Sequence, residues 1–182
     1  VEAIEKLYSD RLAEQVERLA HHAFRGELWE KAVEYLHQAG KKAAARSATH
    51  EAIAYFEQAL DVIKHLPEGK QTIEKTIDIR VDLGPALIAT RGFPAIEVGE
   101  NYTRARELCE RLGDTPQLFP VLWGLARTND VRGELRVGRD LSEQLLKLSE
   151  RVQEPALLLE AHHQNWANLF MLGELTSARM HL

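Results

Sequence analysis

Hydrophobic side chains recur at steps of three and four residues along most of the chain, which is the period of an amphipathic helix. One such series comprises Trp29, Ala32, Val33, Leu36, Ala39 and Ala43, and a second comprises Val98, Tyr102, Ala105, Leu108, Cys109 and Leu112. Each series forms one buried stripe. The pattern predicts about nine helices, over residues 10–25, 28–46, 49–65, 71–91, 95–112, 116–131, 135–152, 155–172 and 174–182.

One stretch within 71–91 also fits a strand. Ile77, Ile79, Val81 and Leu83 alternate with Asp78, Arg80 and Asp82, which is the period of a half-buried strand. No second segment is available to pair with it, and an isolated strand is not stable. Ile73, Ile77, Gly84, Leu87 and Ile88 fit a helical stripe as well, so we expect a helix that Pro85 kinks.

Capping residues suggest where the helices begin and end. Ser9 or Asp10, Ser47 or Thr49, Thr115 before Pro116, and Pro155 are typical of helix starts. Gly26, Gly92, Gly113, Gly133 and Gly173 stand where a stripe ends and are typical of helix ends. The loop at residues 66–70 is the expected weak internal break in a single domain of residues 1–182.

The chain repeats itself. Residues 25–28 and 132–135 both read Arg-Gly-Glu-Leu, residues 172–175 read Leu-Gly-Glu-Leu, and residues 91–93 are a looser copy. Gly92, Gly133 and Gly173 are 41 and 40 residues apart, and Gly84, Gly124 and Trp166 are 40 and 42 apart. A helix–turn–helix unit of about 40 residues is typical of a solenoid.

The helix pairs resemble the tetratricopeptide (TPR) family, which places a small residue in the first helix and alanines in the second. Two groups carry the resemblance: Ala20 with Ala32, Leu36 and Ala39, and Gly40 with Ala52, Phe56 and Ala59. It implies an all-α, right-handed α-solenoid of TPR-like helix hairpins. Trp166 stands where the family has a small residue, and either pushes its helix pair apart or reaches a groove.

Four segments, at residues 10–23, 29–60, 83–93 and 104–126, resemble the region after the nucleotide-binding domain of large bacterial AAA-type or STAND ATPases, which are often joined to an adenylate or guanylate cyclase domain. This resemblance implies a region that senses or recruits something while other domains do the chemistry. Because the chain starts at Val1 and stops within a predicted helix, we expect a fragment of a larger protein.

Composition narrows the function classes further. Hydrophobic residues are 45% of the chain, charged residues 28%, and the net charge is −5 without a basic block, which argues against membrane spans and general nucleic-acid binding. The single cysteine, Cys109, cannot form an internal disulfide and lies on an apolar stripe, so we expect a buried thiol. With no signal-peptide pattern at the N-terminus, we expect the cytoplasm.

No sequence motif indicates catalysis, a metal or a cofactor. The adjacent pairs His21-His22 and His162-His163 point about 100° apart on a helix and cannot chelate one ion. Neither of the glycine-rich phosphate-binding patterns occurs. Asp78 and Asp82 share a helix face, but no second catalytic group accompanies them, so we interpret them as a solvated surface. We expect no enzyme activity in this segment.

The expected function is protein or peptide binding on the face lined by the first helices of successive pairs. If Gly124 and Trp166 are equivalent, the candidate binding residues are Val121, Leu125, Thr128, Asn129, His163 and Phe170. A partner protein, a sibling domain of the same chain, or a second copy joined through the exposed terminal hairpins would fit. The alternatives are a helical nucleic-acid-binding repeat and a fragment of an enzyme whose active site lies elsewhere.

Overall fold

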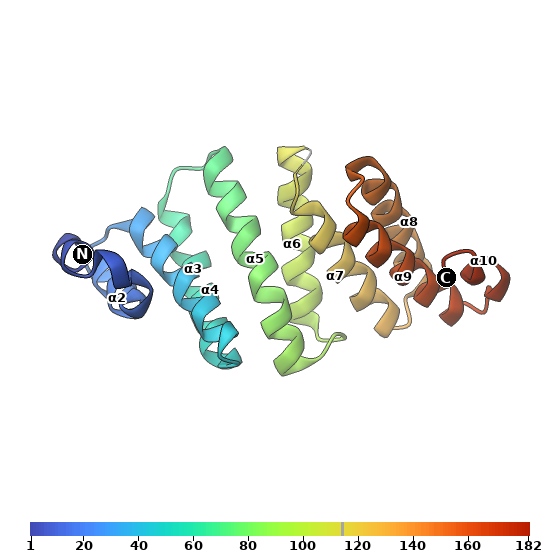
Figure 1. Cartoon of the computed structure of the whole chain (residues 1–182), viewed down its shortest axis with the longest axis horizontal. Helices are drawn as coiled ribbons and strands as arrows, with labels where there is room; N and C mark the ends of the chain where they lie inside the picture. The colour runs from blue at the N-terminus through green and yellow to red at the C-terminus, as the bar shows by residue number, and fades with distance from the viewer. Residues whose placement is uncertain (114) are drawn as a thin grey trace. The chain divides into compact units, whose positions relative to one another are not determined.

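A computed structural model describes residues 1–113 and 115–182 (Figure 1), and every regular element within those ranges is a helix. The α-helices are α1 (Glu2–Leu7), α2 (Val16–Arg25), α3 (Trp29–Ala45), α4 (Thr49–Val62), α5 (Lys70–Arg91), α6 (Ile96–Leu112), α7 (Leu118–Val131), α8 (Leu135–Val152), α9 (Pro155–Met171) and α10 (Leu175–Arg179). Two short 3₁₀ helices, η1 (Ser9–Glu14) and η2 (Ile63–His65), accompany them. The all-α expectation is confirmed.

The chain divides into two compact units, Val1–Thr90 and Arg91–Leu182. This boundary follows α5 and differs from the break expected at residues 66–70. The loop at 66–70 lies inside the first unit because α5 is bonded back to α3, where His37 Nε2 and Asp82 Oδ2 are 2.7 Å apart.

Each of the nine predicted segments contains an α-helix, but the first is misjudged. Residues 9–14 form η1, with Arg11 at a non-helical φ of −136°, so α2 begins only at Val16. The short α1 was not expected, because it buries none of its residues and therefore carries no apolar stripe. The side chains of the predicted caps Ser9 and Asp10 lie outside what the structure describes.

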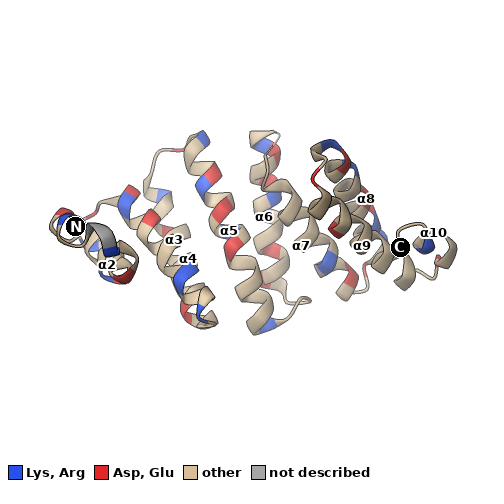
Figure 2. Ribbon diagram, viewed as in Figure 1, with Lys and Arg blue, Asp and Glu red and all other residues tan. Residues whose placement is uncertain are grey.

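The ambiguous stretch around Ile77 is helical, as expected. Ile77 and Ile79 are both fully buried, although they lie two positions apart. A helix buried over a broad arc produces this apparent alternation, because residues two apart then both meet core. Acidic and basic residues alternate along the remaining surface of α5 (Figure 2), and Pro85 lies inside the helix.

Small residues bring α3 and α4 together in the first unit. Gly40 lies under the ring of Phe56, and a β-carbon added at Gly40 would come within 2.5 Å of a ring atom. Phe56 is fully buried. The alanines at the same crossings have at most 1% of their surface exposed: Ala32, Ala39, Ala43, Ala52 and Ala59. The TPR-like pattern of small residues therefore acts by close helix packing.

The second unit starts with a similar contact. Gly124 of α7 packs against the ring of Tyr102 of α6, leaving no room for a β-carbon. Cys109 is 1% exposed, which confirms the expected buried thiol, and burial raises its pKa to about 11. A thiol with this pKa stays protonated and unreactive at neutral pH.

After the first helix the expected starts lie within two residues of the observed ones, and most of the expected closing glycines are right, but the expected side-chain caps do not form. Gly92, Gly113, Gly133 and Gly173 all have φ between +79° and +84°, whereas Gly26 does not, since its neighbour Glu27 takes the left-handed conformation instead. No helix start has a side-chain cap from Ser47, Thr49 or Thr115, and α7 begins at Leu118. Pro155 is the first residue of α9, as predicted.

Candidate functional site

Helix α9 has an apolar face that points to solvent. Its exposed residues recur at one position per turn, and we call the row Leu159, His163, Trp166 and Phe170 the α9 strip. Leu159 is 73% exposed and Phe170 is 57% exposed, while Trp166 is partly exposed. Scattered exposed apolar residues are ordinary in proteins, whereas a contiguous row of them is a candidate contact surface.

The aromatic rings of the α9 strip stack on one another. The ring centroids of His163 and Trp166 are 5.9 Å apart with 19° between their planes, and those of Trp166 and Phe170 are 5.9 Å apart with 24° between theirs. Offset stacking of this kind holds side chains in place. The strip therefore presents an ordered ridge of rings.

The opposite face of α9 is buried and combines three amide side chains with Ala161 and Leu169. Gln164, Asn165 and Asn168 are each at most 4% exposed. With Asp130 of α7 and Ser142 of α8, they form what we call the buried polar network. A helix of a globular protein ordinarily turns its apolar face inward and its polar face outward, so α9 departs from that rule by burying three amide side chains while large apolar residues are exposed.

The network is centred on the carboxylate of Asp130. Gln164 Nε2 donates to Asp130 Oδ2 at 2.8 Å, and Asn168 Nδ2 donates to Asp130 Oδ1 at 2.5 Å and to the backbone oxygen of Leu135 at 3.0 Å. Burial raises the pKa of Asp130, against the opposite effect of the two amide hydrogen bonds and of the nearby Arg127.

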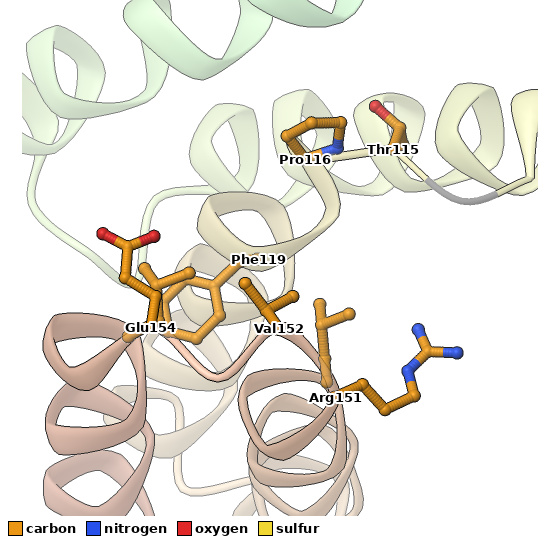
Figure 3. A pocket seen from close by; sticks show the side chains of 8 residues that line it. Thr115, Pro116, Phe119, Arg151, Val152 and Glu154 are labelled. Atoms are coloured by element: carbon orange, nitrogen blue, oxygen red, sulfur yellow. The ribbon is translucent and has the colours of Figure 1, made fainter.

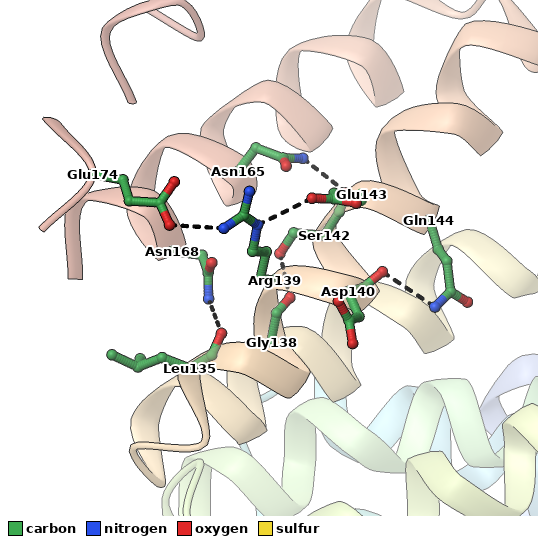
Figure 4. Close-up of polar contacts among 10 residues, drawn as sticks. All are labelled: Leu135, Gly138, Arg139, Asp140, Ser142, Glu143, Gln144, Asn165, Asn168 and Glu174. Carbon is green, nitrogen blue, oxygen red and sulfur yellow. Dashed lines mark hydrogen bonds and ion pairs between the residues drawn. The ribbon is translucent and has the colours of Figure 1, made fainter. Parts of the chain in front are cut away.

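Helix α8 supplies the rest of the network. Asn165 Nδ2 donates to the backbone oxygen of Ser142 at 2.8 Å, and the Ser142 hydroxyl donates to the backbone oxygen of Gly138 (Figure 4). Asp130 Oδ1 occupies the place where a β-carbon of residue 138 would lie, so the site requires glycine there. Two further polar side chains, Arg139 and Glu174, pair at 2.7 Å near the same helices.

These hydrogen bonds fix the rotation of α9 about its own axis. Turning the α9 strip inward would carry Gln164 and Asn168 away from Asp130 and leave a buried carboxylate without partners, which is strongly unfavourable. The buried polar network therefore turns the α9 strip away from Asp130 and Ser142.

Helix α7 extends the aromatic surface on one side. Trp123 Nε1 donates to Glu160 Oε1 at 2.7 Å, which ties α7 to α9 beside the strip. Phe93 meets Trp123 edge to face with ring centroids 6.3 Å apart, and the guanidinium of Arg127 lies 5.7 Å from the Phe93 ring centroid. The surface thus combines aromatic rings with one carboxylate at the edge of the strip.

The residues predicted for the binding face fall into two places. Leu125, Thr128 and Asn129 line a polar groove of about 380 Å³ between α6 and α7, of which Thr128 is 1% exposed and bonds to its own helix. His163 and Phe170 belong to the α9 strip and are not among the described residues that line this groove.

Val121, the remaining predicted residue, is fully buried and presents no surface to a partner. Gly124 and Trp166, which the repeat pattern paired, lie in different surroundings: Gly124 is buried against Tyr102, whereas Trp166 lies in the α9 strip. Sequence reasoning missed Trp166 and Leu159 as surface anchors, although their spacing with His163 and Phe170 carried the signal.

A second hollow lies where α7 begins, α8 ends and α9 begins. It has a volume of about 460 Å³ and mostly apolar walls that include Phe119, Leu148 and Leu157, with Arg151 and Glu154 at its edge (Figure 3). Its size suits a small apolar group.

The residues that the structure describes contain neither a metal-binding cluster nor a membrane-spanning helix. No three His, Cys, Asp or Glu side chains among them gather closely enough to hold a metal ion. Nδ1 of His162 and Nδ1 of His181 are 2.9 Å apart and join α9 to the C-terminal segment. None of the described helices is both long enough and apolar enough to cross a bilayer.

Comparison with known proteins gives one sequence relative. No protein-family model matches the chain. An uncharacterized protein of Rhizobium meliloti (strain 1021) is 32% identical to it over 157 residues. The match covers 85% of this chain but 15% of that protein, so the chain spans a small part of its relative's length.

Solved structures with the same fold are TPR-like repeat proteins. BtubC (BKLC) from P. vanneervenii superposes with a TM-score of 0.71 and 16% identity, over 100% of this chain and 83% of that one. TPR-like repeats of a kinesin light chain-like protein from Podosopora anserina give a TM-score of 0.64 and 18% identity, over 94% and 91%. The chain therefore has a TPR-like α-solenoid fold.

Proposed function

We propose that this chain is a non-catalytic protein-binding module, and that the α9 strip is a contact surface for its partner. The observation that carries the proposal is the distribution of aromatic and amide side chains on α9. Its stacked aromatic rings face solvent while amides and a carboxylate are buried behind them. Aromatic residues in a rigid setting are the usual anchors of protein interfaces.

A rigid anchor favours binding because little conformational freedom is lost when the partner arrives. The stacking of His163, Trp166 and Phe170 reduces the freedom of these side chains before binding, and the network at Asp130 holds the helix that carries them. The groove lined by Leu125 and Asn129 is a second contact region in this proposal, with polar groups suited to specificity rather than to affinity.

We further propose that the module belongs to a large cytoplasmic signalling ATPase of the kind that is often joined to a nucleotide cyclase domain. There it restrains the other domains or recruits a partner. Two observations support this context: the resemblance of four segments to the repeats of such proteins, and the small share of its relative that the chain spans. Deleting the module from the full-length protein should change the rate of ATP or cyclic-nucleotide turnover without abolishing the chemistry.

A photo-crosslinking amino acid at position 170 of the full-length protein tests the binding role directly. Irradiation should join position 170 to a polypeptide, either another protein or another domain of the same chain, and mass spectrometry identifies the adduct. Position 137 is the matched control, since Val137 is also exposed, at 48%, but lies on α8 away from the strip. Equal crosslinking at both positions, or none at 170, would contradict the proposal.

A further inference from the structure

We infer that the polar groove between α6 and α7 binds a carboxylate side chain of the partner polypeptide. The inference rests on the proposed function, in which this groove is a second contact region, and it concerns the chemistry of the group that enters the groove. It comes from comparing this groove, which we call the α6–α7 groove, with its copy one repeat later, which we call the α8–α9 groove.

The two grooves are related by a shift of 40 residues. The contact between Tyr102 and Gly124 recurs 40 residues later between Ser142 and Gln164, where Gln164 Nε2 is 3.3 Å from Ser142 Oγ. The lining residues follow the same shift: the α6–α7 groove includes Gly99, Glu100, Thr103 and Arg132, and the α8–α9 groove includes Arg139, Asp140, Glu143 and Leu172. A difference at one of these positions is therefore a difference in what each groove can bind.

The α8–α9 groove contains its own ion pairs. Arg139 Nη1 is 2.7 Å from Glu174 Oε1, and Arg139 Nε is 3.1 Å from Glu143 Oε1 (Figure 4). The guanidinium thus has a carboxylate on each of two sides. Asp140 lines the same groove without preventing this pairing. Within the α8–α9 groove, the chain itself supplies both the cation and the carboxylates.

The α6–α7 groove has a guanidinium at the equivalent place but no carboxylate bound to it. Residue 99 is glycine, and a β-carbon added there would lie 2.8 Å from Arg132 Nη1. Arg132 donates from Nε to the Pro94 oxygen at 3.1 Å and from Nη2 to the Ala95 oxygen at 2.7 Å. A guanidinium carries five N–H groups, so three are left for a ligand. Within the described part of the chain, Arg132 forms no ion pair.

The group that the α6–α7 groove lacks is the carboxylate that Glu143 supplies in its copy. The counterpart of Glu143 is Thr103, which carries no charge. The two backbone bonds hold Arg132 in place, so little side-chain freedom is lost when a carboxylate binds. Arg104 lines the same groove as a second cation, and its counterpart is Gln144.

The other lining residues favour a single carboxylate beside an apolar group. Glu100 and Glu107 lie one turn before and one turn after Arg104 on α6, and they repel a run of acidic residues. Ile96, which is 71% exposed, and Leu125 form an apolar wall of the groove. A Glu next to a Leu in the partner fits this lining, whereas an acidic tract does not.

The experiment compares two blocked dipeptides, N-acetyl-Leu-Glu-amide and N-acetyl-Leu-Gln-amide, which differ by one charge. Nitrogen-15 NMR follows the Arg132 Nε–H and the Gly99 backbone N–H as each dipeptide is titrated into the folded chain. The Glu dipeptide should shift both signals saturably, with an affinity at least about tenfold above that of the Gln dipeptide, and added salt should weaken its binding. N-acetyl-Glu-Glu-amide should bind no more tightly than the Leu-Glu dipeptide.

Variants of the chain reproduce the difference between the two grooves. Thr103→Glu installs the carboxylate that the α8–α9 groove has at residue 143, and it should abolish binding of the Glu dipeptide. Thr103→Gln has the same side-chain length without the charge and should leave binding nearly unchanged. Gln144→Glu adds the same charge in the other groove and is the matched control. Both positions are exposed, so circular dichroism should show all three variants folded.

The outcomes separate this inference from the proposed function. Equal binding of the Glu and Gln dipeptides, a saturable shift with neither, or an equal loss in Thr103→Glu and Thr103→Gln overturns the carboxylate as ligand. If sodium acetate binds as tightly as the Glu dipeptide, the groove is a site for small carboxylates and the polypeptide occupant is wrong. A polypeptide crosslinked at position 170 in the full-length protein would leave the proposed binding role standing in all these cases.

Discussion

In the first unit, α3 and α4 meet through Gly40, Phe56 and alanines, whereas in the second unit α7, α8 and α9 meet through a carboxylate and side-chain amides. The first interface depends on size, since each small residue leaves room for the neighbouring helix. The second depends on direction, since each hydrogen bond requires its donor to point at one oxygen. Only the second kind fixes which face of a helix looks outward.

This difference explains how α9 keeps an apolar face in water. An interface of small apolar residues would gain by burying Trp166 and Phe170 in place of amides, because burial of apolar surface is favourable and burial of unpaired amides is not. The buried polar network reverses that balance by bonding the amides to Asp130. As a result, a substitution at any residue of the network should lower the stability of the fold.

A large loss of stability is expected from Asn168→Leu. This change removes the hydrogen bonds to Asp130 and to the Leu135 oxygen and leaves the buried carboxylate with fewer partners, so unfolding should become easier by about 3–4 kcal/mol. Urea denaturation measures the change. In the double variant Asp130→Leu/Asn168→Leu the cost should be well below the sum of the two single costs. Additive costs would mean that the two residues do not act together.

Smaller losses of stability are expected in the first unit, where the helix contacts depend on side-chain size alone. Ala32→Leu and Ala59→Leu place a larger side chain at fully buried positions, and each should destabilise the chain by about 1–3 kcal/mol. Thermal unfolding followed by circular dichroism gives the shift for each variant. If both melting temperatures stay at the wild-type value, close packing does not govern this interface.

Helical periodicity predicted the all-α class, and the small-residue pattern predicted the close contacts of α3 and α4, because in that unit apolar positions are also buried positions. The same rule failed for α9, where buried Gln164 and Asn168 look like surface residues and exposed Trp166 looks like core. Their pairing with Asp130 joins residues more than thirty positions apart, and a period along one helix carries no information about such a partner.

For the same reason, only half of the α9 strip could be predicted from the sequence. His163 and Phe170 were identified through the repeat, from the equivalence of Gly124 and Trp166. The φ of Glu27 shows a related limit, since the same Arg-Gly-Glu-Leu turn closes at the glycine in one copy and one residue later in the other. Identical short sequences therefore do not guarantee identical backbone registers.

The pH dependence of stability offers a finer test of the network. Because burial raises the pKa of Asp130, the folded chain holds this proton more tightly than the unfolded chain does. The contribution of Asp130 to the free energy of unfolding is therefore largest below the pKa of the unfolded chain, about 4, and it declines as pH rises through the higher pKa of the folded chain.

Asp130→Asn abolishes this titration. The unfolding free energy of the variant, measured relative to wild type, should therefore improve as pH rises above 4, by at most about 1.4 kcal/mol per pH unit. Asp61→Asn is the control, since Asp61 pairs with Lys64 on the surface. A difference that is flat with pH for Asp130→Asn would show that the carboxylate titrates normally in the folded chain.

The smallest effect on stability is expected on the α9 strip itself. Phe170 is 57% exposed, so Phe170→Ser should change the unfolding free energy by no more than about 0.5 kcal/mol. The adjacent Leu169 is 6% exposed and faces the core, so Leu169→Ser should cost about 2–5 kcal/mol. Two neighbouring apolar residues on one helix would then differ severalfold or more in what they contribute to folding. A comparable loss for both would mean that Phe170 supports the fold, and that the α9 strip is structural rather than a surface held ready for a partner.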